Sequence, residues 1–194
     1  MARIKTGIYG GSFNPIHNAH IALAQELLQA AGLDEIWFVV SPHNPLKAHS
    51  ALLDDDTRLQ LARRALRPYP RLTASDYEFH LPRPSYMWNT LQGMSHDFPQ
   101  RELHLVIGAD NWLLFHQWRH ADDIIATYPI VVYPRQGCDI DAQTLPPTAR
   151  LAQVPLHNLS STEIRQDVMA GRDITGKVPP CIVDDVLRLY RTER

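Results

Sequence analysis

Two histidines, His17 and His20, are three residues apart at the point where a short apolar run gives way to a helical pattern. At this spacing both imidazoles lie on one face of the first helical turn, where backbone N–H groups have no partner within the helix. Just before them, Gly10 and Gly11 allow positive φ angles and a close approach of the backbone to a ligand. Because free N–H groups and the helix dipole both favour negative charge, the segment predicts an anion-binding loop.

Other interpretations of this loop stay open on the residues alone. Asn18 is a candidate N-cap, and histidines at this spacing also occur on solvent-facing helix surfaces or in metal sites. A metal site needs further ligands at fixed spacing, and the nearby His43, His49, Asp54 and Asp56 form no recognisable set. We therefore predict no metal held by the protein. The segment also lacks the Gly-Lys-Ser/Thr ending of a Walker A loop.

A second helix start lies in the string Asn158–Arg165. Ser160, with Glu163 three residues later, has the form of a capping box, which needs no ligand. A helix start rich in hydroxyls, with a guanidinium one turn in, also suits a polyphosphate, because hydroxyls and N–H groups donate hydrogen bonds and the guanidinium neutralises charge. Both interpretations can hold at once. The residues available to phosphate are Ser160, Ser161, Thr162 and Arg165.

A third junction of strand and helix is predicted at Ile107–Asn111, which contains Gly108 and Asp110. On spacing alone, the simpler role for Asp110 is to cap the helix that follows. A contact with a nucleotide is the alternative.

The elements that must position these residues follow from apolar patterning. Short, dense apolar runs predict strands buried on both faces, as parallel strands covered by helices are; they are Ile4–Tyr9, Ile36–Val40, Leu103–Ile107 and Ile130–Tyr133. Helical patterns lie between and after them, at 19–31 ending before Gly32, 57–66 behind Asp54–Asp56, 85–94, 162–170 and 180–190. The alternation predicts an α/β, Rossmann-like doubly wound fold, with a mainly parallel sheet and helices on both faces. Ligands of such sheets bind beyond the carboxyl ends of the strands, where the strand order reverses.

Composition restricts the remaining possibilities. The 194 residues carry a formal charge of −2, with 44% apolar and 21% charged residues, which predicts one globular domain over residues 1–194. General nucleic-acid binding is disfavoured, because it usually needs a basic surface. No apolar run approaches the roughly 18 residues of a membrane span, and no signal peptide is evident. Cys138 and Cys181 lie outside any zinc-ligand spacing, so we expect a cytoplasmic protein without disulfides.

The loop and the second helix start together resemble a known superfamily. Residues 11–20 read Gly-x-Phe-x-Pro-x-His-x-x-His, which is similar to the signature of nucleotidyltransferases of the His-x-Gly-His type, with Ala19 where glycine is usual. The string Ser160–Arg165 resembles the Ser-Ser-Thr-x-Ile-Arg motif of adenylyltransferases in that superfamily. The resemblance implies that His17 and His20 contact the α- and β-phosphates of ATP. It also implies that the helices from about residue 160 complete the ATP site, together with Gly10, Gly11, Ser12 and Phe13 of the loop.

Further segments resemble the nicotinate-nucleotide adenylyltransferase branch. Residues 83–91 are similar to its Pro-Ser-Tyr-Thr-x-x-Thr-Leu segment, with Met87 in place of threonine, and Trp118 matches a tryptophan that stacks on the pyridine ring. A core role remains open for Trp118, and more so for Trp112. The resemblance implies mononucleotide contacts from Ser12, Lys47, Ser85, Tyr86, Met87 and Trp118, and ATP contacts from Gly108, Asp110 and Arg135. An ordinary solvated lysine is the alternative for Lys47.

The family implies transfer of the adenylyl group of ATP to nicotinate mononucleotide, giving deamido-NAD and pyrophosphate in NAD biosynthesis. The attack is in line, with no covalent enzyme intermediate, and Mg²⁺ is carried by the ATP phosphates. ATP and nicotinate mononucleotide are then the partners; we expect neither nucleic acid nor membrane, and a homo-oligomer is compatible with the sequence. The alternatives are preference for nicotinamide mononucleotide, another small-substrate transferase of the pantetheine-phosphate or cytidylyl type, and a non-catalytic nucleotide sensor. A class I aminoacyl-tRNA synthetase core is disfavoured by length and by the absence of a Lys-Met-Ser-Lys-Ser loop.

Overall fold

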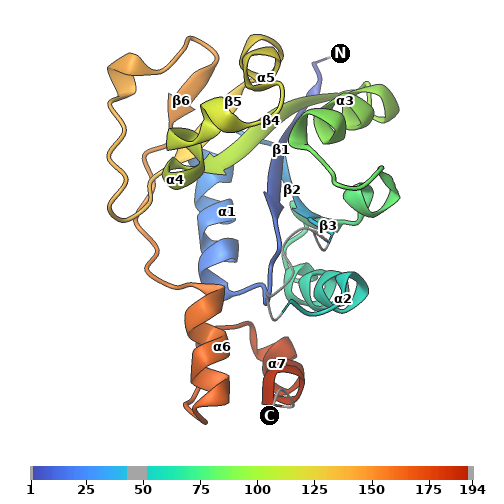
Figure 1. Ribbon diagram of the computed structural model, residues 1–194, viewed down its shortest axis with the longest axis vertical. Coiled ribbons are helices and arrows are strands. Elements are labelled where there is room, and N and C mark those ends of the chain that lie inside the picture. Colours follow the sequence, from blue (N-terminus) through green and yellow to red (C-terminus); the bar gives the residue numbers. More distant parts are fainter. Residues whose placement is uncertain (1, 43–51, 192–194) are drawn as a thin grey trace.

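A six-stranded sheet forms the centre of the molecule (Figure 1), whose computed structural model describes residues 2–42 and 52–191. All its neighbouring strands pair in parallel, in the order β3-β2-β1-β4-β5-β6. The strands are β1 (Ile4–Gly11), β2 (Glu35–Val40), β3 (Leu72–Ser75), β4 (Arg101–Gly108), β5 (Ile130–Tyr133) and β6 (Ala149–Leu151). The helices are α1 (Asn18–Ala30), α2 (Asp55–Leu66), α3 (Met87–Asp97), α4 (Ala109–Leu113), α5 (Ala121–Thr127), α6 (Ser161–Met169) and α7 (Val183–Arg191).

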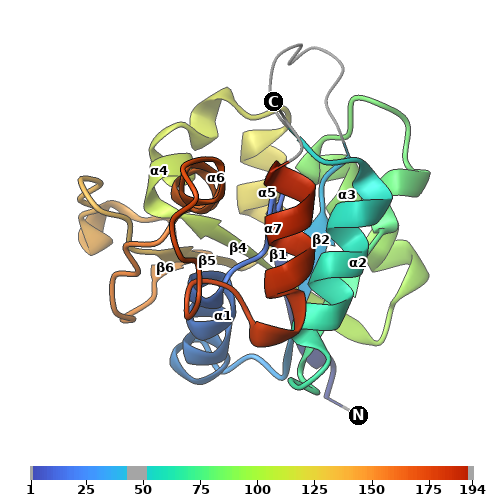
Figure 2. The ribbon, with the colours of Figure 1, turned by 90° about the horizontal axis from the view of Figure 1, so that it is seen from below.

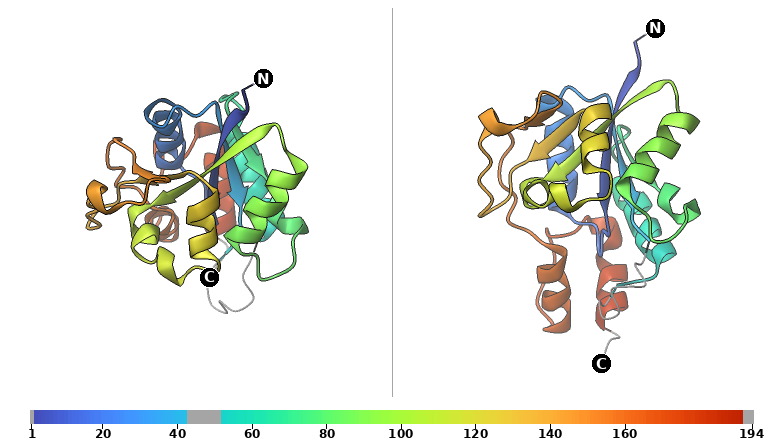
Figure 3. Two further views of the ribbon diagram at one scale, coloured as in Figure 1. Left: turned by 90° about the horizontal axis from the view of Figure 1, so that it is seen from above. Right: turned by 45° about the horizontal axis from the view of Figure 1, so that its top comes forward.

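Helices cover both faces of the sheet, as the side-chain alternation of the strands requires. On β1, Ile8 packs into the cluster formed with α3 and α5, whereas the next residue, Tyr9, packs into the cluster formed with α1, α2, α6 and α7. Seen from below and from above (Figures 2 and 3), α7 lies beside α2, and α3 and α5 lie across the sheet from α1. The predicted doubly wound architecture is confirmed, and the sheet is wholly parallel rather than mainly so.

The strand order reverses between β1 and β4, which are neighbours in the middle of the sheet. The chain leaves β1 toward α1 on one face and leaves β4 toward α4 on the other. The two chain directions diverge beyond Gly11 and Gly108, so the carboxyl ends of these strands border an open crevice. Helices α6 and α7 project beyond that same edge of the sheet (Figure 1).

Local signals explain most element ends. Asp54 caps α2, since its carboxylate accepts a hydrogen bond from the Thr57 N–H at 2.8 Å. Gly32 has a φ of 56° immediately after the C-cap of α1, a left-handed conformation that glycine adopts without strain. Strands β3 and β6 were not expected, because short edge strands leave only brief apolar patterns. In the described part of the chain, no helix is both long and apolar enough to cross a membrane.

Candidate active site

A cavity of about 770 Å³ opens at the carboxyl ends of β1 and β4, where the strand order reverses. Its walls come from the ends of four strands and from the loop before α3. Among the residues predicted to bind substrate, those that line it are Gly10, Gly11, Ser12, Ser85, Tyr86, Met87, Gly108 and Trp118. Trp112 does not line it and stacks on Phe115 instead, at 5.3 Å between ring centroids.

A smaller hollow of about 20 Å³ adjoins the cavity, with Tyr9 and Tyr133 contributing to both. His17, His20 and Arg135 line this hollow, together with Ala19 and with residues of the segment that leads to α6. The imidazoles therefore line the hollow and the predicted pyridine-binding residues line the cavity. Six described residues that were also predicted line neither: Phe13, Asp110, Ser160, Ser161, Thr162 and Arg165.

His17 and His20 form a capping box at the start of α1, in which each side chain accepts a hydrogen bond from the backbone of the other. His17 is the N-cap, and its Nδ1 accepts a hydrogen bond from the His20 N–H at 3.4 Å; the His20 Nδ1 accepts one from the His17 N–H at 3.2 Å. The rings stack with centroids 3.5 Å apart. Because each Nδ1 accepts, the proton of each neutral ring is on Nε2, which is a donor. The alternative in which Asn18 caps the helix is wrong, since Asn18 is its first residue and its side chain donates to the Gly176 carbonyl.

Both imidazoles are neutral near pH 7. Burial, reinforced by the positive charge of Arg135, lowers the pKa of His17 to about 3. The pKa of His20 is also well below its usual value, because of burial first and then the neighbouring His17 and Arg135. The pair therefore presents hydrogen-bond donors, rather than positive charges, to whatever occupies the hollow.

Helix α6 starts against the loop that carries the histidines. Ser161 Oγ donates a hydrogen bond to the Pro15 carbonyl at 2.9 Å, and Arg165 Nη1 donates to the Asn14 carbonyl at 2.8 Å. Ser160 caps α6 as expected, by accepting from the Glu163 N–H at 3.1 Å. In a complete capping box the Glu163 carboxylate would also accept from the Ser160 N–H. Here that carboxylate pairs instead with the Lys177 ammonium group at 2.7 Å. The two predicted phosphate-binding segments are thus in direct contact.

Gly108 and Asp110 lie at the third junction, and Arg135, which follows β5, lies beside them. Gly108 is the N-cap of α4, and no side chain caps this helix, so the capping role considered for Asp110 is wrong. The Asp110 carboxylate lies 3.7 Å from Arg135 Nε instead. A side chain at position 108 would displace the Asp110 carboxylate from this position. Arg135 Nη2 also donates to the Tyr133 hydroxyl at 3.3 Å, so the guanidinium is held at the edge of the hollow.

The positive φ angle expected at Gly10 or Gly11 of the first loop occurs at another residue. Gly10 and Gly11 are the last residues of β1 and have no positive φ; the left-handed residue is Phe13, with a φ of 44°. A Cβ at position 10 would lie 2.8 Å from the methyl carbon of Met87, so a side chain there would displace the end of Met87. Met87 therefore packs on the backbone of the loop. Lys47, also predicted to contact the mononucleotide, lies outside the described residues.

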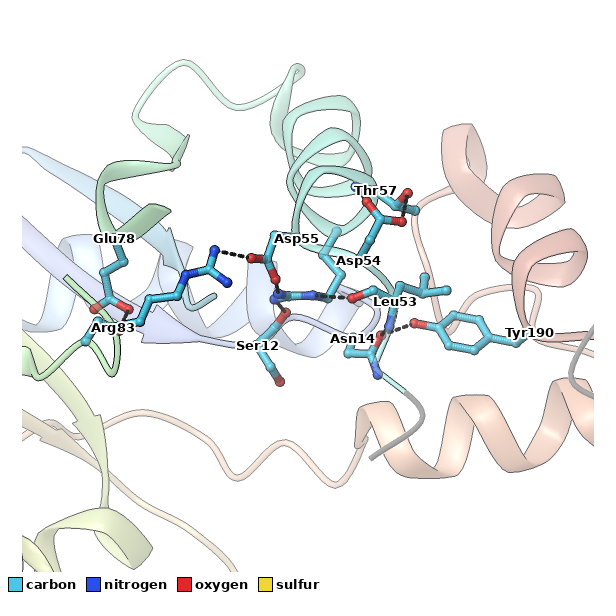
Figure 4. Close-up of polar contacts among 11 residues, drawn as sticks. Ser12, Asn14, Leu53, Asp54, Asp55, Thr57, Glu78, Arg83 and Tyr190 are labelled. Atoms are coloured by element: carbon cyan, nitrogen blue, oxygen red, sulfur yellow. Dashed lines mark hydrogen bonds and ion pairs between the residues drawn. The ribbon is translucent and has the colours of Figure 1, made fainter. Parts of the chain in front are cut away.

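Sequence reasoning missed Arg58, which braces the loop from beneath. Its guanidinium is fully buried and donates to the Ser12 carbonyl at 2.6 Å, the Leu53 carbonyl at 3.0 Å and the Asp55 carboxylate at 2.6 Å. On the other side of the same loop, the Asn14 side-chain oxygen accepts from the Leu53 N–H and from the Tyr190 hydroxyl (Figure 4). Arg58 carried no local signal beyond being a charged residue within an amphipathic helix pattern.

Glu78 was missed as well and lies in the cavity wall at 3% exposure. Its carboxylate accepts from Thr90 Oγ1 at 2.8 Å and from Ser85 Oγ at 3.1 Å. Burial raises the pKa of this carboxyl, and the hydroxyl hydrogen bonds oppose the rise. Ser85, predicted to contact the mononucleotide, therefore directs its proton to Glu78 and leaves its oxygen lone pairs for a ligand.

In residues 2–42 and 52–191, no three His, Cys, Asp or Glu side chains cluster in a way that could hold a metal ion. The prediction that magnesium arrives with ATP is not tested by this finding. What the geometry offers is a set of donors for phosphate oxygens next to a cavity large enough for a mononucleotide.

The fold and the paired helix starts define a nucleotide-binding α/β protein of the nucleotidyltransferase class, and residues 8–167 match the family described as cytidylyltransferase-like. The chain is 46% identical over 188 residues to a protein of Bacteroides fragilis named probable nicotinate-nucleotide adenylyltransferase, covering 97% of this chain and 94% of the relative. A relative of the same name from Bacteroides thetaiotaomicron is 47% identical over 172 residues, covering 89% and 85%. This chain belongs to the nicotinate-nucleotide adenylyltransferase family.

A solved structure supports the fold independently. Nicotinic acid mononucleotide adenylyltransferase of Plasmodium falciparum, complexed with NaAD, superposes with a TM-score of 0.80 at 20% identity, covering 96% of this chain and 97% of that chain. At that identity the likeness concerns the fold alone.

Proposed function

We propose that this protein transfers the adenylyl group of ATP to nicotinate mononucleotide, giving deamido-NAD and pyrophosphate. The observation that carries the proposal is the contact between the two helix starts. Ser161 and Arg165 donate to carbonyls 146 and 151 residues earlier in the chain, in the loop that precedes His17 and His20. These bonds bring the start of α6 to the loop that carries the two imidazoles, so a triphosphate bound there would meet groups of both helices.

The chemistry requires positioning rather than a nucleophilic side chain. An oxygen of the mononucleotide 5′-phosphate attacks the α-phosphorus of ATP in line; one P–O bond forms as the bond to pyrophosphate breaks. His17 and His20 donate their Nε2–H groups to α- and β-phosphate oxygens as negative charge moves to the leaving group. A neutral ring whose Nδ1 accepts a backbone hydrogen bond carries its proton on Nε2, where it can be donated to phosphate. Because the helix start also fixes both rings, these donors need no reorganisation during the reaction.

The remaining predicted residues divide between the two substrates. ATP would contact Gly10, Gly11, Ser12, Phe13, Gly108, Asp110, Arg135, Ser160, Ser161, Thr162 and Arg165. The mononucleotide would contact Ser12, Lys47, Ser85, Tyr86, Met87 and Trp118. The pyridine-binding residues line the cavity and the imidazoles line the hollow that shares Tyr9 and Tyr133 with it, which supports this division.

Residues 1–194 would act as one nucleotidyltransferase domain, with α6 and α7 completing the ATP site. Hydrogen bonds from α6 and from Tyr190 of α7 to the first loop support this arrangement. Magnesium would enter with ATP and bridge its phosphate oxygens. The free thiols of Cys138 and Cys181 fit the reducing cytoplasm as its compartment.

The test is to incubate the protein with ATP, Mg²⁺ and one mononucleotide and to measure pyrophosphate. We expect release with nicotinate mononucleotide and little with ATP alone. Binding of both substrates without pyrophosphate release would identify a nucleotide sensor and overturn the proposal. Release with phosphopantetheine, but with neither pyridine mononucleotide, would assign the protein to another transferase branch.

A further inference from the structure

Two guanidinium groups, those of Arg83 and Arg119, line the cavity beside the loop before α3. The charge of Arg83 is already balanced, because its Nη2 donates to the Asp55 carboxylate at 2.8 Å. Arg119 forms no ion pair with any carboxylate in the described ranges, and its Cζ lies 5.0 Å from the ring centroid of Tyr86. The cavity wall therefore carries one guanidinium whose positive charge is free to meet a ligand.

The ring beneath Arg119 belongs to the residue that opens α3. Tyr86 is the N-cap of this 11-residue helix, in an extended conformation, and no side chain caps the helix. The first N–H groups of α3 and the Arg119 guanidinium are thus two sources of positive potential on one stretch of wall. A negative group of the substrate placed there would be favoured by both.

The chemistry of the walls indicates which part of a pyridine mononucleotide reaches Arg119. Tyr86, Met87 and Trp118 provide the aromatic and apolar surface that suits a flat ring. The 5′-phosphate belongs at the other end, where the strand ends meet the hollow with the histidines. When the pyridine ring of the substrate packs against Tyr86 and Trp118, a substituent on the pyridine ring lies near the Arg119 guanidinium.

Building on the proposed function, we propose that Arg119 is a specificity-determining residue that selects a pyridine carboxylate over the uncharged carboxamide. A guanidinium donates charge-assisted hydrogen bonds to a carboxylate, and gains much less from an amide oxygen. Glu78, the acid in the same wall, accepts hydrogen bonds from the hydroxyls of Ser85 and Thr90 and is common to the native protein and an Arg119 variant, so its charge acts equally in both. The Tyr86 ring, 5.0 Å from the Arg119 Cζ, provides a cation–π contact that favours this position of the guanidinium.

Calorimetric titration with nicotinate mononucleotide and with nicotinamide mononucleotide tests the proposal without relying on turnover. The two ligands share ribose and phosphate, so the ratio of their Kd values isolates the ring substituent. We expect the native protein to prefer the acid, and Arg119→Gln to reduce that preference by about tenfold, or about 1.4 kcal/mol, through weaker binding of the acid alone. Arg119→Lys should retain most of the preference, since the charge is kept.

Two controls distinguish recognition of the carboxylate charge from a change in the shape of the cavity: the salt dependence of binding and a matched variant. Added salt should weaken binding of the acid more in the native protein than in Arg119→Gln, because only the native protein pairs the carboxylate with this cation. Arg67→Gln removes an exposed arginine at the end of α2, away from the cavity, and should leave the ratio unchanged.

Three outcomes would overturn the assignment of Arg119. They are equal weakening of both ligands in Arg119→Gln, an unchanged ratio, and a larger change in the ratio for Arg83→Gln. Equal weakening would indicate that the guanidinium contacts the shared ribose or phosphate. A failure of the proposed function looks different, because pyrophosphate is then not released by the native protein whichever mononucleotide is bound.

Discussion

Helices α1 and α3 both begin at the candidate active site, and their first turns are completed in different ways. At α1 the side chains of His17 and His20 accept the hydrogen bonds of each other's backbone N–H groups. At α3 the N-cap residue Tyr86 makes no such bond. The donors that α1 offers a ligand are therefore imidazole Nε2–H groups, whereas α3 offers its backbone.

The difference teaches where each region is vulnerable to mutation. Side-chain donors are lost when one residue is replaced, so the α1 region depends on the identity of two histidines. Backbone donors survive substitution, so the α3 region depends on the shape and charge of the residues around it, such as Trp118 and Arg119. We expect single changes near α1 to stop the reaction, and single changes near α3 to alter affinity and selectivity.

The largest effect is expected from His20→Ala, which removes one donor from the α1 region. We expect kcat to fall by about 10²- to 10⁴-fold, the range for loss of one preorganised donor or acid–base group. Pyrophosphate release at saturating substrates measures it, with circular dichroism to verify the fold. His80→Ala, at a site whose side chain is 76% exposed, is the matched control. Native turnover in His20→Ala would remove the proposed role of this residue.

The next largest effect is expected from Arg58→Met, which tests how much the buried hydrogen bonds of Arg58 to the first loop stabilise the protein. Three acceptors lose a buried guanidinium, including the Ser12 carbonyl and the Asp55 carboxylate. We expect the free energy of unfolding in urea to fall by about 3 kcal/mol. Arg63→Met, on the same helix but 45% exposed, should change it by less than about 0.5 kcal/mol. Similar losses in the two variants would contradict the bracing role.

Trp118→Ala examines the α3 side of the comparison. Loss of one stacking surface should weaken mononucleotide binding by about 1–3 kcal/mol and leave ATP binding nearly unchanged. Isothermal titration with each ligand measures both. Trp112→Ala, at a tryptophan that packs on Phe115 outside the cavity, should not produce this selective loss. Equal weakening of ATP and mononucleotide in Trp118→Ala would point to a collapsed core.

The smallest effect concerns pH and the buried imidazoles. The pKa of His17 is lowered to about 3 in the folded protein, so between that pH and about 6.5 the unfolded chain binds more protons. The contribution of His17 to the free energy of unfolding is fully present above about pH 6.5. It is lost as the pH falls toward the folded pKa, by at most about 1.4 kcal/mol per pH unit. Urea unfolding between about pH 6 and pH 4.5 should show a shallower slope for His17→Gln. Identical slopes would show that His17 does not titrate as described.

The fold could be predicted where burial leaves a pattern in the sequence. The four central strands stand out because both of their faces are covered, and Gly32 marks the end of α1 because its backbone is left-handed. The edge strands β3 and β6, with four and three residues, are too short for such a pattern. Helix α5 was not expected either, since it has seven residues of which only Ala121 and Ile124 are buried, so its apolar pattern is short.

The candidate site could be predicted where its residues are neighbours in sequence, as in the loop with His17 and His20 and the string at Ser160. The residues that support them could not, because their contacts join distant segments. Arg58 reaches Ser12 across 46 residues, and Tyr190 reaches Asn14 across 176. Glu78 comes to the cavity through tertiary packing alone, whereas Arg119 directly follows the predicted Trp118 and was overlooked beside it.

The bond between Tyr190 and Asn14 also constrains the order in which the molecule can be assembled. Synthesis produces the first strand and its histidine loop early, and the residue that completes that loop emerges only with α7. A nascent chain on the ribosome can pair its central strands and form the hydrogen bond from Arg58 to the Ser12 carbonyl well before this moment. The hydrogen bond to Asn14 forms only when the last helix returns to the place where the chain began.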